Sequence, residues 1–235
     1  MLINILVFST LLWSSVCYSG GWYYTTVDSI APPAYLLNYD GDDPSGVTYL
    51  DYNGGESTLN ATSNTADSVT TSSVQFDAAN ENLYWGSFEV LPATGTIYCT
   101  ITVTDRDSDS TMGSFCILEY LYSTTMGIYV YRDASYVRMY YIDGSNTNVA
   151  SSVSLSFATS YRIGVTWDQP NDKYSISVVT TGNPPSWTED TGEGLGVWSN
   201  TPNTFSIGEN ASGISVNERV DVSDVYMLSG YQTAE

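Results

Sequence analysis

The stretch YRIGVTWDQPNDKYSISV, residues 161–178, contains two runs in which apolar and polar residues alternate. In the first run, Ile163, Val165 and Trp167 alternate with polar residues or glycine, and the second run starts at Tyr174. Successive residues of a β-strand point to opposite faces of a sheet. Each run therefore predicts a strand with one buried face and one face in contact with water.

The polar segment between the two runs predicts a turn. Pro170 fixes its own backbone angle at a value that suits turns, and its polar neighbours tolerate turn geometry. A turn at this place sets Trp167 opposite Tyr174 and Val165 opposite Ile176, which are stabilising pairs in an antiparallel hairpin. Because a hairpin with one apolar face needs a second layer to cover it, the stretch predicts a layered β-fold.

The same pattern of short strands extends over most of the chain. Between residues 69 and 228, segments rich in Val, Ile, Thr and Tyr follow one another, among them VSLSF at 153–157, and turn-forming residues separate them. This spacing predicts an all-β fold, an antiparallel β-sandwich that forms a single domain over residues 20–235, with an irregular lead-in up to residue 68. The one long loop is expected at residues 181–203.

The composition excludes several classes of function. The chain has 235 residues, a net charge of −20 and no histidine. The negative charge repels phosphate backbones and excludes nucleic acid as a partner. Without histidine, a Ser-His-Asp or Cys-His site and a His-ligated zinc cannot form. A jelly-roll glycosidase would need a pair of carboxylates, and the Glu-x-Asp-x-x-Glu pattern of such glucanases does not occur, so we expect no enzyme activity.

The N-terminal segment is the only part of the chain that predicts contact with a membrane. Residues 1–19 are mainly apolar and end in small residues, which is typical of a secretory signal peptide. The apolar run is short for a membrane span, and an uncleaved hydrophobic anchor is the alternative. In both cases the mature protein is expected to be secreted or exposed on a surface.

Three segments together carry a resemblance to a known family. They are VQFDAANENLYWGSFEV at 74–90, the hairpin at 161–178, and the pair FSIGENASG and VDVSDVYML between 205 and 228. Their order resembles the laminin G-like branch of the concanavalin A-like jelly rolls over residues 69–228. The chain departs from this pattern at 178–180, where VVT replaces a turn that often contains glycine. The resemblance implies a jelly-roll sandwich, and it bears on fold more than on function.

Two cysteines outside the N-terminal segment predict a disulfide. Cys99 and Cys116 lie in strand-like segments, and a hairpin centred between Asp107 and Ser108 would place them opposite each other. A secreted context favours oxidation of such a pair. The alternative is a pair of buried, reduced thiols.

An acidic loop predicts a calcium site. Asp105, Asp107 and Asp109 alternate in DRDSDS, and calcium prefers several oxygen ligands from such turns. A second acidic loop, DGDDPSG, lies at residues 40–46. Laminin G-like domains often hold one calcium ion at the sandwich rim, so the resemblance also implies calcium as a cofactor. Plain solvated turns are the alternative.

Candidate carbohydrate-binding residues lie in two places. Trp187 and Trp198 belong to the predicted long loop, where an indole face could stack on a sugar ring, or could instead cap the open end of the core. Tyr98 and Glu119 are expected on one otherwise apolar sheet face, which is either a shallow groove or part of the core. The sequence also contains two glycosylation sequons, at Asn60 and Asn210.

These features favour a non-catalytic extracellular recognition module that binds carbohydrate on a glycan or glycoprotein. The first alternative is a structural surface protein that self-assembles, such as a virion or cell-surface filament subunit, because Tyr- and Thr-rich strands fit that role as well. The second alternative is a glycosidase of the jelly-roll type.

Overall fold

The computed structural model describes the following residues: 33–38, 48–51, 56–58, 62–64, 68–69, 73–77, 82–85, 91–105, 111–123, 126–133, 135–144, 146–191, 195–200, 202–208 and 218–231. The N-terminal segment, the sequon residues Asn60 and Asn210, the 40–46 loop, Asp107 and Asp109 lie outside these residues. Within this part of the chain, no helix is long and apolar enough to cross a membrane.

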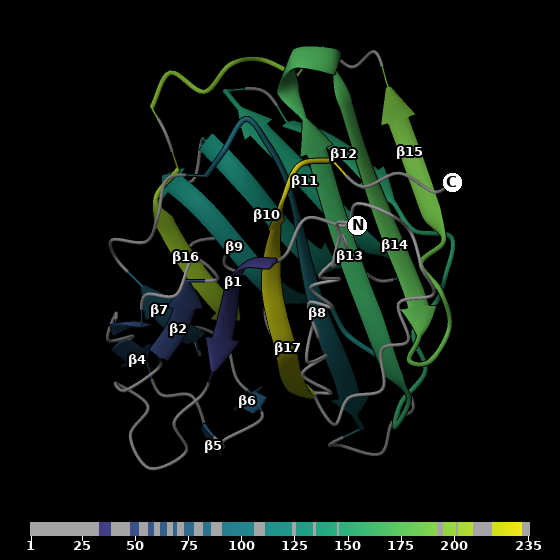
Figure 1. The fold of residues 1–235 in the computed structure, drawn as a ribbon. Coiled ribbons are helices and arrows are strands. Elements are labelled where there is room, and N and C mark those ends of the chain that lie inside the picture. The colour runs from purple at the N-terminus through teal and green to yellow at the C-terminus, as the bar shows by residue number, and fades with distance from the viewer. Residues whose placement is uncertain are drawn as a thin grey trace, which may run out of the picture.

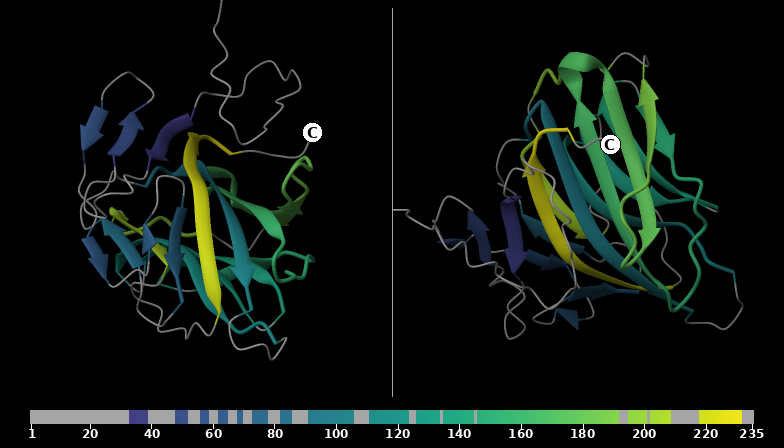
Figure 2. Two further views of the ribbon diagram at one scale, coloured as in Figure 1. Left: turned by 90° about the horizontal axis from the view of Figure 1, so that it is seen from below. Right: turned by 45° about the vertical axis from the view of Figure 1, so that its right-hand side comes forward.

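The described strands form two antiparallel sheets, which confirms the predicted all-β sandwich. The front sheet has the order β15 (Trp187–Thr191), β14 (Lys173–Thr180), β13 (Ser160–Asp168), β8 (Thr94–Thr104), β17 (Arg219–Ser229), β1 (Pro33–Asn38), β2 (Thr48–Asp51) and β3 (Glu56–Thr58), with β6 (Ser73–Phe76) paired to β17 and β5 (Ser68–Val69) to β6. The back sheet has the order β12 (Asn146–Ala150), β11 (Val137–Asp143), β10 (Met126–Arg132), β9 (Phe115–Ser123), β16 (Thr204–Gly208), β7 (Asn82–Trp85) and β4 (Thr62–Asn64). Figures 1 and 2 show the two sheets stacked face to face.

The hairpin predicted from residues 161–178 forms with the expected register. Trp167 lies opposite Tyr174 and Val165 lies opposite Ile176, in strands β13 and β14. Pro170 belongs to a short 3-10 turn, η1 (Gln169–Asn171), that joins the two strands at the top of Figure 1. The local alternation and the turn residues therefore predicted this part of the fold residue by residue.

The hydrophobic core lies between the two sheets and contains the inward-facing residues of both. Trp167 is buried in it, and its indole N–H donates a hydrogen bond of 2.8 Å to the carbonyl of Pro92. A Cβ atom on Gly95, which lies opposite Trp167 on β8, would come within 2.5 Å of the indole ring. Glycine at this position is what allows the tryptophan to lie flat against its neighbouring strand.

Two sequence predictions on the strands are wrong. Residues 153–157 were predicted as a strand and do not form one. Residues 181–203 were predicted as one long loop, but this segment contains strand β15. At residues 153–157, side chains take the place of a neighbouring strand as hydrogen-bond partners of the backbone. The amide of Val153 donates to the hydroxyl of Ser151, and the amide of Ser156 donates to the hydroxyl of Tyr161. Apolar residues there pack on the core without belonging to a sheet, so alternation alone misassigned them.

The predicted disulfide is also wrong. Strand β8 pairs with β13 and β17 in the front sheet, whereas β9 pairs with β10 and β16 in the back sheet. Cys99 and Cys116 therefore lie in different sheets, and both are buried free thiols. Burial, together with the nearby carboxylate of Asp224, raises the pKa of Cys99 to about 12. The two strands are consecutive in the chain but belong to different sheets, and alternation cannot distinguish this arrangement from a hairpin.

Candidate functional site

The outer face of the back sheet carries three neighbouring tyrosines. Tyr129 and Tyr131 belong to β10, and Tyr140 belongs to β11. The residues that alternate with them are buried in the hydrophobic core, namely Ile128, Val130, Met139 and Tyr141. Since strand residues alternate between faces, the three tyrosines point away from the core, and each is half-buried.

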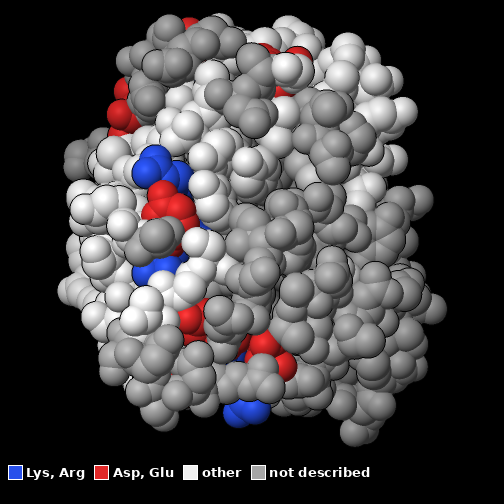
Figure 3. All heavy atoms as spheres, turned by 180° about the vertical axis from the view of Figure 1, so that it is seen from behind, with Lys and Arg blue, Asp and Glu red and all other residues white. Residues whose placement is uncertain are grey.

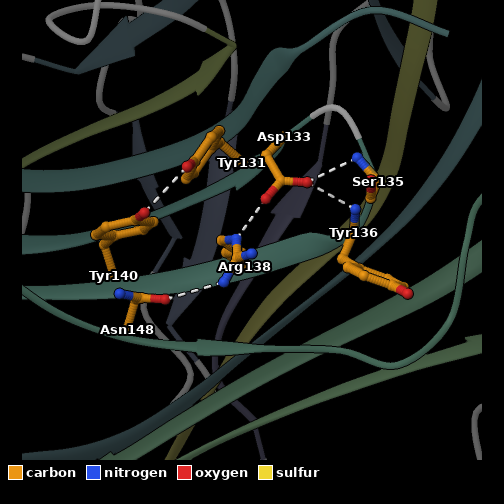
Figure 4. A network of polar contacts seen from close by, with 7 residues as sticks. All are labelled: Tyr131, Asp133, Ser135, Tyr136, Arg138, Tyr140 and Asn148. Carbon is orange, nitrogen blue, oxygen red and sulfur yellow. Dashed lines mark hydrogen bonds and ion pairs between the residues drawn. The ribbon is translucent and has the colours of Figure 1, made fainter.

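The three rings form one continuous aromatic surface. Tyr129 lies directly opposite Tyr140, and the two rings stack with centroids 4.6 Å apart and planes 7° apart. Tyr131 packs diagonally on Tyr140 with centroids 5.1 Å apart, and their hydroxyl oxygens are 3.0 Å apart. Figure 4 shows these two hydroxyls pointing toward each other. Each such ring pair contributes about 0.5–1.5 kcal/mol beyond simple burial, so the surface is held in a fixed shape.

Arg138 extends this surface and is held from both sides. Its Nε donates to Oδ2 of Asp133 at 2.5 Å, and its Nη1 donates to Oδ1 of Asn148 at 3.1 Å. The other oxygen of Asp133 accepts from the amides of Ser135 and Tyr136, at 2.7 Å and 2.8 Å. Figure 4 shows Arg138 lying between Asp133 and Asn148. We call Tyr129, Tyr131, Tyr140, Arg138 and Asn148 the tyrosine face.

The protonation states of these groups are defined at neutral pH. Burial raises the pKa of Asp133, but hydrogen bonds from Tyr136, Arg138 and Ser135 outweigh it and hold that pKa below its usual value. Burial, with the nearby hydroxyl of Tyr140, raises the pKa of Tyr129 to about 12. The pKa of Tyr131 is raised by burial and by its hydrogen bond to Tyr140. The site therefore presents neutral phenol hydroxyls beside one ion pair.

A view from behind shows how charge is distributed on this side of the molecule. Described basic and acidic side chains lie close together there, among uncharged described atoms (Figure 3). The chain as a whole has 26 acidic residues and 6 basic ones. Cationic groups next to aromatic rings are therefore a scarce feature of this protein, and the tyrosine face has one.

Glu119 also lies on the outer side of the back sheet, but it is buried. Its strand neighbours Leu118 and Tyr120 belong to the core, and Glu119 itself is 1% exposed. Its carboxylate lies 3.7 Å from the sulfur of Cys116 and 3.5 Å from the hydroxyl of Ser206. A buried carboxylate cannot form the wall of an open groove.

A β-bulge explains why Cys116 and Glu119 share a face. Cys116 pairs with Tyr131, but the next paired residue, Leu118, pairs with the adjacent Val130. The residue between them is an extra one, which reverses the alternation for the rest of the strand. Tyr98 lies instead on the outer face of the front sheet, so the predicted face shared by Tyr98 and Glu119 does not exist.

Trp187 forms a second aromatic feature, on the outer face of the front sheet. It lies opposite Ser177 on β14 and is half-buried. Its ring meets Tyr98 edge to face, with centroids 5.9 Å apart. A Cβ atom on Gly164 would lie 2.6 Å from the ring of Tyr98 and 2.9 Å from that of Trp187. The missing side chain of Gly164 therefore makes room for both rings, and Trp187 stays a candidate contact.

Trp198 is a core residue in this structure. It is 8% exposed and stacks on Tyr141, with ring centroids 5.1 Å apart and planes 22° apart. Its indole N–H donates to the carbonyl of Ile142 at 2.9 Å. The alternative reading of the sequence, in which a tryptophan caps the open end of the core, therefore describes Trp198.

The calcium prediction rests mainly on residues outside the described part of the chain. Of its three aspartates, only Asp105 is described. Among the described residues, no group of three acidic or thiol side chains lies close enough to hold a metal ion. The predicted site at Asp105, Asp107 and Asp109 stays a prediction.

Sequence reasoning missed the tyrosine face, although its signal was present. GIYVYR and YVRMYYI alternate aliphatic residues with Tyr129, Tyr131 and Tyr140. Alternation of this kind assigns the tyrosines to the face opposite the core. The sequence does not contain the pairing register of β10 with β11, and this register is what brings the three tyrosines next to one another.

Comparison with known proteins supports the fold alone. No family model matches the chain, and no curated protein matches it. Among solved structures, the botulinum neurotoxin type G receptor-binding domain matches with a TM-score of 0.58 and 13% identity, over 86% of this chain and 48% of that one. The serotype D binding domain matches with a TM-score of 0.59 and 11% identity, over 86% and 49%.

A third match is the serotype D ligand-binding domain in complex with N-acetylneuraminic acid, with a TM-score of 0.55 and 11% identity. This chain spans about half the length of these solved structures. The chain is therefore an antiparallel β-sandwich that shares its architecture with part of each of these receptor-binding domains. The laminin G-like branch of the sandwich stays a prediction.

Proposed function

We propose that this protein is a non-catalytic carbohydrate-recognition module that binds glycans on the tyrosine face. The observation that carries the proposal is the stacked arrangement of Tyr129, Tyr131 and Tyr140 beside a fixed arginine and a fixed amide. A sugar ring has one apolar face of C–H groups and a rim of hydroxyls. Ring carbons that the tyrosine stack leaves exposed can contact the former, and the fixed polar groups can bind the latter and set the orientation.

The tyrosine face is ordered before a ligand arrives. Its aromatic residues belong to the paired strands β10 and β11, and Arg138 is tied to Asp133 and Asn148. Tyrosine has few rotatable bonds, so it gives contact area at low cost in conformational entropy. Binding to a preorganised surface loses less free energy to ordering than binding to loops.

The structural neighbours support the same general role. They are named as receptor-binding and ligand-binding domains, and one was solved with N-acetylneuraminic acid. Because their identity to this chain is only 11–13%, the shared architecture shows that such a sandwich can carry a ligand site, and the site itself is argued from the tyrosine face. We further propose that the module belongs to the laminin G-like branch, and that it acts outside the cell or on a surface.

Trp187 is proposed as a second sugar contact. It is half-buried on the edge strand β15, and its ring is fixed by Tyr98. Because the front and back sheets turn their outer faces in opposite directions, one short glycan cannot contact both Trp187 and the tyrosine face. The two places are therefore separate sites, and the tyrosine face is the larger one.

The test is a glycan array on the wild-type protein, followed by titration of the best glycan against two variants. Tyr140→Ala removes the ring that contacts both other tyrosines, and Tyr122→Ala removes a tyrosine of the same sheet that is 50% exposed and serves as the matched control. Contact of a flat ligand with one aromatic ring, as measured for stacked bases, is worth about 1–3 kcal/mol, so Tyr140→Ala should weaken binding by about fivefold or more.

Tyr122→Ala should bind as the wild type does. Melting curves of both variants check that the fold is kept. Absence of binding to every glycan on the array would contradict the proposed function, and formation of ordered assemblies in its place would favour the structural surface protein. Equal affinity of Tyr140→Ala and wild type would move the site away from the tyrosine face.

A further inference from the structure

The charge of Arg138 is balanced by Asp133, next to the tyrosine face. Its Nε–H donates to Asp133, whose side chain retains 25% of its exposure while that of Arg138 retains 29%. Asp133 cannot easily turn away, because its second oxygen accepts two backbone hydrogen bonds. The guanidinium therefore meets a ligand as one half of an ion pair, with little excess positive charge.

Arg138 nevertheless keeps hydrogen-bonding capacity for a ligand. A guanidinium has five N–H donors. Within the described part of the chain, Nε donates to Asp133 and Nη1 donates to Asn148, which leaves three N–H groups for water or a sugar hydroxyl. The neighbouring hydroxyls of Tyr131 and Tyr140 can donate and accept hydrogen bonds at the same surface. The site is thus rich in hydrogen-bonding groups and poor in net charge.

The following inference rests on the proposed function. We propose that the tyrosine face binds uncharged sugars in preference to acidic ones, and that the carboxylate of Asp133 causes this preference. Because Asp133 already pairs with the guanidinium, the carboxylate of an acidic sugar would gain little attraction from Arg138, and it would meet the like charge of Asp133, which costs affinity. The net charge of −20 on the whole chain opposes anionic ligands as well, but ionic strength screens that long-range effect beyond roughly 8 Å at physiological salt. Selectivity at physiological salt is therefore a local property of the tyrosine face. Glu119 lies opposite Tyr129 but is buried, so Asp133 is the carboxylate that a ligand can approach.

The experiment compares matched glycans that differ by one acidic residue: lactose and sialyllactose, and N-acetyllactosamine and its sialylated form. Affinities are measured for wild type, Asp133→Asn and Asp224→Asn at physiological salt. Asparagine has the shape of aspartate and keeps a side-chain oxygen for the amides of Ser135 and Tyr136. Asp224 is exposed on the front sheet, so Asp224→Asn removes the same unit of charge far from the tyrosine face.

We expect the wild type to prefer the neutral member of each pair by about tenfold or more, and Asp133→Asn to reduce that preference to about twofold or less. Asp224→Asn should keep the wild-type preference. Equal or tighter binding of the sialylated glycans by wild type would overturn the inference while leaving the proposed function in place. An equal change in both variants would also overturn it, because overall charge would then explain the selectivity. Absence of binding to both members of each pair would overturn the inference, whereas the proposed function would be contradicted only by absence of binding to every glycan on the array.

Discussion

Replacing Trp198 with alanine should destabilise the protein strongly, because its indole fills the end of the core. The side chain is 8% exposed, stacks on Tyr141 and donates to the carbonyl of Ile142. Removal of a buried tryptophan side chain costs about 3–5 kcal/mol of unfolding free energy, through lost burial and the cavity that it leaves. The carbonyl of Ile142 would lose its partner as well, which places the expected cost near the upper end of this range.

Thermal melts of matched variants measure the effect. A domain of 150–250 residues loses about 2–4 °C of melting temperature for each kcal/mol, so Trp198→Ala should melt roughly 6–20 °C below wild type. Trp187→Ala is the control, since its ring is only half-buried and packs edge to face with Tyr98, and its removal should cost less than about 2 kcal/mol. A Trp198→Ala variant that melts like Trp187→Ala and has lost glycan binding would refute the core assignment and make Trp198 a binding residue.

Three further predictions concern thiols, tyrosines and calcium. A thiol reagent should leave Cys99 and Cys116 unmodified in the folded protein, because both are buried, and label them after unfolding; a peptide that links them by a disulfide would contradict the fold. Burial raises the pKa of Tyr129 and of Tyr231 to about 12, from 10.0, so the stability that they contribute is present below pH 10 and is lost as the pH rises toward 12. Melting temperatures measured across this range should fall, and constant values would disprove the assignment. Calcium at millimolar concentration should raise the melting temperature if the loop at 105–109 holds it, and Asp107→Asn should abolish that rise; identical curves in calcium and in chelator would remove the site.

The hairpin at 161–178 could be predicted fully because all of its information is local. Alternation fixed the faces of β13 and β14, and the residues around Pro170 fixed the turn and with it the register. The segments that become β8 and β9 are equally recognisable as strands from their apolar and β-branched residues. Their predicted pairing failed because a crossing between two sheets has the same local pattern as a hairpin.

The candidate site depended on contacts between segments, which a single sequence does not contain. The stacking of Tyr129 on Tyr140 follows from the register of β10 with β11. The bulge beside Cys116 reverses the alternation in β9 and carries Glu119 to the outer side of the sheet, where packing buries it.

The two tryptophans of the predicted loop illustrate the same limit. Both follow glycine- or proline-rich segments, and both were equally good candidates for a sugar contact or a core cap. Trp198 is buried because Tyr141, more than fifty positions earlier in the chain, offers a ring to stack on. Trp187 stays half-buried because its own strand is paired at the edge of the front sheet.

The most direct test of the account is to map glycan binding onto the backbone by NMR. Amide chemical shifts would be followed while the best neutral glycan from the array is titrated into the isotope-labelled protein. The account predicts that the largest changes fall in β10, β11 and β12, around Tyr131, Arg138 and Asn148, with β13 to β15 unchanged at low glycan concentration. Changes centred on Trp187 in β15, or the absence of any change at saturating glycan, would contradict it.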